Sequence, residues 1–359
     1  MYKNASISIE SSSGGYSVFF QRFEYSELLK EPNSVILLDK NFAKIAEIAN
    51  SIRNIEIQPG EESKDISEVA QIMALLAEKG VNKDTKIVAI GGGTIQDLAT
   101  FVSSTYMRGI AWTYYPTTLQ AMADSCIGGK SAINVGKYKN LVGNYHPPRE
   151  VFIDASLIAT LSDEDITCGI LEALKIAYAG GEESTNLILK LISEIEISEK
   201  PRPEIYENII AASLHTKKYF IEKDEFDQNT RKILNFGHTY GHAIEAASNY
   251  KIHHGLSIGI GMLASFLHRG QEFTTSSEER LILVIRRLLK PFAFYLREEI
   301  NAMHEENFQR FIQLDKKVSS EYIRFIHSKN GRLELINLPN NSTTRKNAFN
   351  SVIEAANAI

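Results

Sequence analysis

Histidines are concentrated in one short segment of the chain. Four of the nine histidines lie between residues 238 and 254. His238 and His242 are four residues apart, so on a helix they share one face, a spacing that suits two metal ligands or one ligand and a proton shuttle. A single histidine is usually structural, but four together with neighbouring glycines favour a metal or catalytic site.

A carboxylate that could complete such a site lies earlier in the chain. Only Cys126 and Cys168 are present and they form no CxxC pair, so a zinc site would need histidine and carboxylate ligands. Glu172 and Lys175 are one helical turn apart in the nearly all-apolar segment 170–177. A solvated salt bridge is the alternative, but an ionisable pair in such a helix is costly unless it has partners.

Three consecutive glycines form a candidate phosphate-binding turn. A β-rich run at 86–90 leads into Gly91, Gly92 and Gly93, and apolar residues then follow helical spacing. Glycines before a helix let backbone amides approach an anion at the positive end of that helix. The pattern is not a full GxGxxG, because Gln96 occupies the last glycine position and no acid about 20 residues further on has the usual ribose role. A tight strand-to-helix turn is the alternative.

Basic side chains recur around these motifs. In a chain with 39 basic and 44 acidic residues, and so a net charge of −5, their convergence would indicate a small polyanionic ligand such as a phosphate-bearing sugar acid. Taken singly, each would be an ordinary surface residue. They are Arg108, Lys130, Lys139, Lys218, Arg231, Lys316 and Lys317.

The elements that must position these residues change in character along the chain. The first part alternates β-rich runs, such as 34–39, with helical segments, such as 66–79, as in a parallel α/β sheet. From about residue 157, long helical patterns dominate until strand-like runs at 322–326 and 333–336. The length of 359 residues suits two domains. We predict an α/β domain with a parallel sheet at 1–156 and a mainly α-helical domain at 157–359.

Composition and charge exclude several classes of protein. The net charge of −5 gives no field that would gather nucleic acid or an anionic membrane. The start of the chain alternates polar and apolar residues and lacks the apolar run of a signal peptide, and no stretch of about 18 apolar residues could span a membrane. With only two cysteines, we expect a cytoplasmic protein.

The motifs in combination resemble those of 3-dehydroquinate synthases. The match is dense from about Val88 to Met262 and extends more thinly to Asp39, 60–64 and 315–317. Its motifs are GGGxxxD at 91–97, YMRG at 106–109, PTTL at 116–119, DSxxGGK at 124–130, KNLxG at 139–143, ExxK at 172–175 and NxGHTxGHAIE at 235–245. The resemblance implies an N-terminal dinucleotide-binding domain and a C-terminal metal- and substrate-binding domain. It also implies a lyase, dependent on NAD and on zinc or cobalt, that eliminates phosphate from 3-deoxy-arabino-heptulosonate 7-phosphate and closes a carbocycle.

The resemblance assigns roles residue by residue. The metal ligands would be Glu172, His238 and His254, while His242 would face the substrate and His253 would take no part. The NAD-binding residues would be Asp39, Glu61, Lys64, Gly92, Gly93, Asp97, Thr117, Thr118, Lys130, Lys139 and Thr160. Lys218 and Arg231 would bind the substrate carboxylate, and the residues around its phosphate would be Lys130, Asn140, His242 and one of Lys316 and Lys317.

The resemblance also implies a reaction sequence and an assembly. NAD would oxidise the substrate transiently, phosphate would leave by β-elimination, hydride would return, and the opened ring would close by an aldol step. Asp124, Lys175 and Asn235 would orient hydroxyls and relay protons. Arg108 would reach into the partner subunit's site, which implies a homodimer.

Several positions depart from the family pattern and keep other functions open. Gln96, His146 and Leu256 stand where glycine, glutamine and glutamate are usual, and residues 135–138 also differ. The alternatives are a related cyclase acting on sedoheptulose 7-phosphate or glucose 6-phosphate, a metal-dependent polyol dehydrogenase, and an NAD-binding protein without catalysis. The carboxylate substrate is favoured because Lys218, Arg231, Asn235 and His242 keep the 3-dehydroquinate synthase type.

Overall fold

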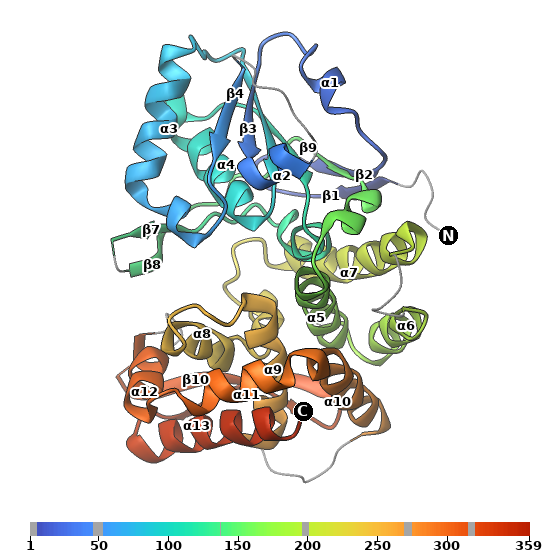
Figure 1. The fold of residues 1–359 in the computed structure, drawn as a ribbon, viewed down its shortest axis with the longest axis vertical. Coiled ribbons are helices and arrows are strands. Elements are labelled where there is room, and N and C mark those ends of the chain that lie inside the picture. The colour runs from blue at the N-terminus through green and yellow to red at the C-terminus, as the bar shows by residue number, and fades with distance from the viewer. Residues whose placement is uncertain (1–5, 46–52, 137, 196–200, 269–274, 315–319) are drawn as a thin grey trace. The chain divides into compact units, whose positions relative to one another are not determined.

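The computed structural model describes residues 6–45, 53–136, 138–195, 201–268, 275–314 and 320–359. The chain forms two compact units (Figure 1). The first contains Met1–Ser162 and Ile197–Phe226, and the second contains Asp163–Glu196 and Asp227–Ile359. Within the described ranges, none of the helices combines the length and the apolar character needed to cross a membrane.

A seven-stranded sheet forms the centre of the first unit. Its strand order is β1-β2-β9-β6-β5-β3-β4. Only the β1–β2 pair is antiparallel, and the other neighbours run parallel. The strands are β1 (Ser6–Ile9), β2 (Tyr16–Phe20), β3 (Ser34–Asp39), β4 (Asn54–Ile57), β5 (Lys86–Gly91), β6 (Trp112–Pro116) and β9 (Glu150–Ile153). The predicted parallel α/β sheet is therefore confirmed.

Apolar strands and amphipathic helices build the core of this unit. Strand β3 is buried along nearly its whole length, as expected for a parallel strand with both faces covered. One face packs with residues from α1 and α2 in a cluster that includes Ile36, Leu38 and Phe42. Helix α4 contacts β3, β5 and β6. The helices and short turns are α1 (Tyr25–Leu28), α2 (Lys40–Ile45), η1 (Glu61–Lys64), α3 (Ile66–Glu78), α4 (Gly93–Thr105), η2 (Tyr106–Arg108), η3 (Ala121–Ser125) and η4 (Ala155–Thr160).

Two further elements of the first unit lie outside the main sheet. A small antiparallel hairpin is formed by β7 (Ile133–Val135) and β8 (Tyr138–Val142). Helix α7 (Pro203–Lys223) packs on η3, η4 and β1. The sequence-based division placed α7 after residue 157 with the helical part, whereas its packing partners place it in the first unit. The sequence-based boundary was drawn from local helical and strand-like patterns, and such patterns contain no information about these long-range contacts.

The second unit is mainly helical, in agreement with the predicted fold class. Helix α9 is buried on nearly all sides and packs against α5, α8 and α13. The antiparallel pair β10–β11 corresponds to the strand-like runs near the end of the chain. The elements are α5 (Asp163–Ala179), α6 (Glu182–Ser193), η5 (Thr230–Asn235), α8 (His238–Ala247), α9 (His254–His268), α10 (Ser276–Leu289), η6 (Lys290–Phe292), α11 (Ala293–Asn301), α12 (Glu305–Leu314), β10 (Tyr322–Lys329), β11 (Arg332–Pro339) and α13 (Ser342–Asn357).

Candidate active site

The glycine turn lies at the point where the order of the sheet changes direction. After β3 the chain first adds β4 on one side and then β5 on the other, so the carboxyl ends of β3 and β5 border a topological switch point. Ligands of open α/β sheets bind at such points. Asp39 ends β3, and its Cβ lies 3.0 Å from where a Cβ on Gly91 would be. The sheet therefore brings Asp39 to the glycine turn.

Close packing explains why the turn is built from glycine. A Cβ on Gly91 would lie 2.3 Å from the Ile95 side chain, and one on Gly92 would lie 3.0 Å from the Thr118 side chain. Gly92 caps α4, so the positive end of that helix is open to a close approach by an anion. Thr117 donates its backbone amide to the Gly91 carbonyl at 3.0 Å. The turn thus has the shape and polarity of a pyrophosphate site.

A buried lysine joins the first turn of α4 to η1 and β8. Lys64 Nζ lies 2.8 Å from Asp97 Oδ2, 3.4 Å from Glu61 Oε1, and 3.0 Å from Asn140 Oδ1, to which it donates. Burial by itself would lower the pKa of Lys64, but the carboxylates of Asp97 and Glu61 outweigh it and raise that pKa. Lys139 Nζ lies 3.8 Å from Glu61 Oε1 at the edge of this group. The structure therefore brings together five residues predicted near NAD or substrate phosphate.

Thr160 has a local role in the structure. Its hydroxyl donates to the Leu157 carbonyl at 2.6 Å, within η4. Asp39 likewise accepts the backbone amides of Asn41 and Phe42 through Oδ1, at 2.8 and 3.1 Å. The predicted cofactor contacts of Thr160 and Asp39 stay predictions.

A lysine that the sequence analysis did not select contacts Asp124. Lys217 is buried, and its Nζ donates to the Asp124 carboxylate, to the Asp124 carbonyl at 2.6 Å and to the Ile127 carbonyl at 3.1 Å. Lys218, which we selected, instead lies 3.5 Å from Glu222, and its side chain is 32% exposed. Neighbouring helical residues point about 100° apart, so a shift of one residue changes the face. The apolar periodicity of α7 is the sequence signal that could have separated the two lysines.

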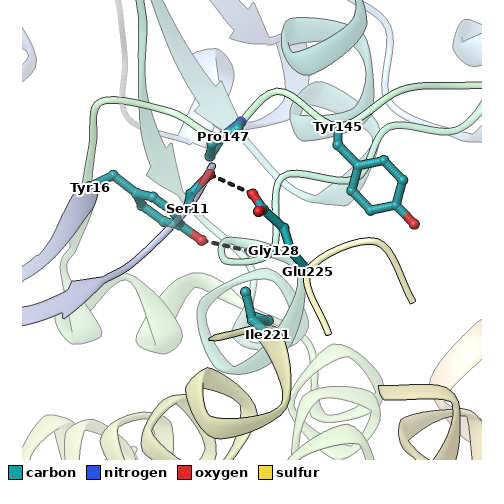
Figure 2. A pocket seen from close by; sticks show the side chains of 7 residues that line it. All are labelled: Ser11, Tyr16, Gly128, Tyr145, Pro147, Ile221 and Glu225. Carbon is teal, nitrogen blue, oxygen red and sulfur yellow. Dashed lines mark hydrogen bonds between the residues drawn. The ribbon is translucent and has the colours of Figure 1, made fainter. Parts of the chain in front are cut away.

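The segment after Asp124 is held by contacts from distant parts of the first unit. Figure 2 shows a small pocket beside it, lined by Ser11, Tyr16, Gly128, Tyr145, Pro147, Ile221 and Glu225. Gly128 donates its amide to the Tyr16 hydroxyl at 2.8 Å, and Ser11 donates its hydroxyl to Glu225 at 2.5 Å. The bond from Gly128 to Tyr16 holds the backbone that leads to Lys130, and the bond from Ser11 to Glu225 joins two other residues that line the pocket.

Three predicted metal ligands meet in the second unit. Glu172 comes from α5, His238 begins α8 and His254 begins α9. One ligand atom from each of these side chains lies within 4.8 Å of the others. A Cβ on Gly255 would lie 2.4 Å from the Cα of Cys168, so glycine allows α9 to approach α5 closely enough to bring His254 to Glu172.

Glu172 carries the strongest indication of a cation-binding site. Its side chain is 1% exposed, and Oε2 accepts a hydrogen bond from Lys175, which is also buried. Its other oxygen, Oε1, is buried without a hydrogen-bond partner among the described residues, although it lies 3.2 Å from His254 Nε2. A buried carboxylate oxygen without a hydrogen-bond donor is costly. The donor set of one carboxylate and two imidazoles is one that zinc prefers, so the residues fit the metal.

The two histidines are oriented by neighbouring oxygens. His254 Nδ1 lies 3.0 Å from Glu245 Oε2, and His238 Nδ1 lies 3.2 Å from the Phe236 carbonyl oxygen. Metal-binding histidines typically donate their second ring nitrogen to such an acceptor. Burial alone would lower the pKa of His254, but Glu245 and Glu172 outweigh it and raise that pKa to about 10. The environment of His254 therefore favours a positive charge, which a cation can supply in place of a proton.

The remaining histidines of the segment lie nearby with different surroundings. The ring of His242 is centred 5.2 Å from that of His238 and 5.8 Å from that of His254, and with Glu245 and His254 it forms a second group of close donor atoms. His253 instead faces Glu164 at 3.3 Å, and more than half of its side chain is exposed. Spacing suggests His238 and His242 as paired ligands, but the close donor atoms of His238 are grouped with those of Glu172 and His254. His242 lies next to this group.

The other predicted substrate residues are distributed as follows. Arg231 is buried in η5, and Asn235 at the end of η5 donates to the Lys232 carbonyl at 3.0 Å. Arg108 is exposed, with a positive φ of 64° in the turn η2. Lys316 and Lys317 lie outside the described residues.

Two of the positions that depart from the family pattern have structural partners. His146 Nε2 lies 3.3 Å from the Ile110 carbonyl, and burial lowers the pKa of this imidazole. Leu256 is fully buried in α9, where an apolar side chain suits the core.

Comparisons with known proteins identify the family of the chain. Two protein-family models match it, 3-dehydroquinate synthase N-terminal at residues 54–168 and 3-dehydroquinate synthase C-terminal at residues 169–318. A 3-dehydroquinate synthase of Dictyoglomus thermophilum is 40% identical over 288 residues, which cover 79% of this chain and 78% of that protein.

Solved structures support the fold. The structure of 2-deoxy-scyllo-inosose synthase complexed with carbaglucose-6-phosphate, NAD+ and Co2+ matches with a TM-score of 0.81 and 22% identity, over 97% of this chain and 99% of that one. A probable glycerol dehydrogenase from Sinorhizobium meliloti matches with a TM-score of 0.61 and 14% identity, over 95% and 97%. At these identities the solved structures show the fold alone, whereas the family models and the sequence relative decide the family. The chain therefore belongs to the 3-dehydroquinate synthase family.

Proposed function

We propose that this lyase converts 3-deoxy-arabino-heptulosonate 7-phosphate into 3-dehydroquinate with release of phosphate, using NAD and a zinc or cobalt ion. The observation that carries the proposal is the group Glu172, His238 and His254, with its buried carboxylate oxygen without a hydrogen-bond donor among the described residues. A polyol dehydrogenase or a silent NAD-binding domain would not need a buried Glu172–Lys175 pair at such a group.

Some side chains around the proposed cation site would bind the ion, and others orient those ligands. Glu172, His238 and His254 would hold the ion, which when bound acts as a Lewis acid that lowers the pKa of substrate hydroxyls. Glu245 accepts from His254 Nδ1 and leaves Nε2 directed toward Glu172. Lys175 keeps its ammonium on Glu172 Oε2, which makes it a positive group available for a developing oxyanion.

The first unit supplies the groups expected to hold NAD. The pyrophosphate would lie at the glycine turn and the start of α4, since a side chain on Gly92 would collide with Thr118. We assign the adenosine side to Asp39, Glu61 and Lys64, as the resemblance implies. NAD bound by these residues would supply a reversible hydride acceptor and would not be consumed.

Proton transfer and anion binding would use the polar groups that remain. Asp124 is paired with Lys217, so it could accept a hydrogen bond from a substrate hydroxyl with its own charge balanced. We propose Lys217, more than Lys218, as the lysine of this part of the site. The phosphate would be bound by Lys130, Asn140 and His242, and the carboxylate by Arg231.

The assembly is proposed to be a homodimer. Arg108 is exposed in the turn η2, and an arginine that reaches into another subunit must be accessible on the surface of its own. Size measurement of the purified protein tests this proposal, and a monomer that retains full activity would contradict it.

One assay separates the candidate functions. The purified protein is mixed with NAD, zinc and in turn 3-deoxy-arabino-heptulosonate 7-phosphate, sedoheptulose 7-phosphate and glucose 6-phosphate, and both phosphate and reduced NAD are followed. We expect phosphate release from the first substrate without net reduced NAD. Net reduction of NAD would indicate a dehydrogenase, and preference for another sugar phosphate would indicate a different cyclase. No reaction with any substrate would contradict the enzymatic proposal.

A further inference from the structure

The side chain of Gln96 links the first turn of α4 to the backbone of Lys130. Gln96 is only 4% exposed, and its Nε2 donates to the Lys130 carbonyl at 2.6 Å and to the Thr100 hydroxyl at 3.1 Å. Thr100 in turn donates to the Gln96 carbonyl at 2.7 Å. A buried amide is costly unless it is hydrogen-bonded, so these contacts decide whether glutamine is tolerated at this position.

The start of α4 thereby holds the segment around Lys130 at two points. Gln96 binds the carbonyl of Lys130, and Asp97 Oδ1 accepts the amide of Ala132 at 3.2 Å. Asp97 is also the partner of buried Lys64. The same helical turn that follows the glycines thus contacts the backbone on both sides of residue 131.

Glycines make the backbone before Lys130 dependent on such contacts. Gly128 and Gly129 both have positive φ, at 101° and 61°. A Cβ on Gly129 would lie 2.9 Å from the Pro147 nitrogen, so a stiffer residue cannot replace it. The path is set instead by hydrogen bonds, including that from Gly128 to Tyr16 shown in Figure 2. Two flexible residues in sequence mean that the direction of Lys130 is not fixed by local conformation alone.

We propose that Gln96 is a positioning residue for Lys130, which sets the affinity for the phosphorylated substrate through the Lys130 backbone. The inference rests on the proposed function in one respect, the assignment of Lys130 to an anionic group of the substrate. Because Gln96 follows the glycine turn directly, the bond also connects the proposed pyrophosphate turn to the proposed phosphate-binding lysine. Gln96 also departs from the glycine of the family pattern, so the connection is a feature of this chain.

The first test compares two substitutions of similar shape. Gln96→Met keeps the length of the side chain and removes its hydrogen bonds to the Lys130 carbonyl and to the Thr100 hydroxyl. Thr100→Val removes the Thr100 hydroxyl and leaves the hydrogen bond from Gln96 to Lys130 in place. We expect Gln96→Met to raise KM for the phosphorylated substrate about tenfold, the effect of one lost hydrogen bond to Lys130, with kcat nearly unchanged. Thr100→Val should leave KM unchanged. Equal KM values in Gln96→Met and the unmodified protein would overturn the proposal.

A second test separates positioning from general stability. If Gln96 acts through Lys130, Gln96→Met should add little to KM in a Lys130→Met background, whereas a merely structural role would give the same increase in both backgrounds. Hydrogen exchange of the amides of residues 128–132 provides a readout that needs no activity. We expect faster exchange in Gln96→Met and unchanged exchange in Thr100→Val.

The outcomes distinguish this inference from the proposed function. If the unmodified protein releases no phosphate, the proposed function fails, and the exchange experiment alone decides whether Gln96 holds the segment. If the unmodified protein is active and Gln96→Met changes neither exchange nor KM, the positioning role is overturned while the proposed function stands.

Discussion

The charged clusters of the two units are completed in different ways. In the first unit, buried Lys64 is surrounded by the carboxylates of Asp97 and Glu61 and the amide oxygen of Asn140. In the second unit, buried Glu172 has Lys175 on one oxygen and no hydrogen-bond donor among the described residues on the other. The first cluster already contains its cation, whereas the second has ligand atoms arranged for one.

The difference shows which buried charges indicate a metal site and which are already balanced by neighbouring side chains. Lys64 has a raised pKa because its neighbours stabilise its charge, so its cluster supports the fold without any added ion. Two carboxylates face His254 from opposite ring nitrogens. Such a concentration of negative charge is balanced either by a proton on His254 or by a metal ion, and the metal ion would in addition be bound by His238.

Removal of Glu172 should have the largest effect. Glu172→Gln removes the charge that completes the donor set, so we expect bound zinc to be lost and kcat to fall by at least about 1000-fold. Metal content by mass spectrometry and phosphate release measure the two effects. The control is Glu164→Gln, which removes a carboxylate from the same helix where it faces the exposed His253. Full activity of Glu172→Gln, or an equal loss in Glu164→Gln, would contradict the metal assignment.

Neighbouring lysines on α7 provide the next test. Lys217→Met should lower kcat about 100-fold, because Asp124 loses the ammonium that balances its charge. Lys218→Met should change kcat less than about threefold, since Lys218 faces Glu222 with a partly exposed side chain. Steady-state rates of phosphate release decide the matter. The opposite order of effects would return the assignment to Lys218.

The free energy of unfolding of a Lys64 variant tests the comparison between the two clusters. Lys64→Met leaves the largely buried Asp97 without its ammonium partner, and we expect the free energy of unfolding to fall by about 3 kcal/mol. The control Lys86→Met breaks a half-exposed pair with Glu31 and should cost at most about 1 kcal/mol.

Added zinc sharpens the same comparison. Free zinc at 100 times its Kd should stabilise the unmodified protein and Lys64→Met equally, by about 2.7 kcal/mol, but not Glu172→Gln. Denaturant unfolding with and without zinc measures these differences. A larger zinc effect in Lys64→Met than in the unmodified protein would mean that the carboxylates of the first cluster also bind the ion.

The smallest effect is expected at the start of α3. Asp65 accepts the amide and hydroxyl of Ser67 at 2.9 and 2.6 Å and the amide of Gly136 at 3.1 Å, and these bonds lower its pKa. A lowered pKa in the folded state stabilises the protein above the unfolded value of about 3.9, and this contribution is lost as pH falls through the folded value. Asp65→Ala should therefore lower Tm by roughly 2 °C at neutral pH and by less in acid. A pH-independent shift in Tm would contradict this explanation.

Much of the fold follows from local sequence patterns. The buried strand β3 and the passage from strand β5 through glycines into α4 occur where the apolar spacing predicts them. These elements are encoded locally, because a strand with both faces covered in a parallel sheet is a continuous apolar run, and glycines allow a tight turn from strand to helix. The position of α7 depends on contacts with β1 and η3, which no local pattern records.

The full set of site residues could be predicted only where the family motifs combine residues from distant parts of the sequence. Spacing alone pairs His238 with His242, because it describes one helix, whereas the close group joins three helices through the near approach of α9 to α5 at Gly255. The apolar surroundings of Glu172 already indicated that carboxylate, and the resemblance supplied His254. The same kind of matching selected Lys218, one residue away from the lysine that contacts Asp124.

Anomalous diffraction from crystals of the protein loaded with one equivalent of zinc tests the central claim most directly. We predict a single peak within coordination distance of Glu172, His238 and His254. A peak at another group of side chains, or no peak at full zinc occupancy in solution, would contradict the account.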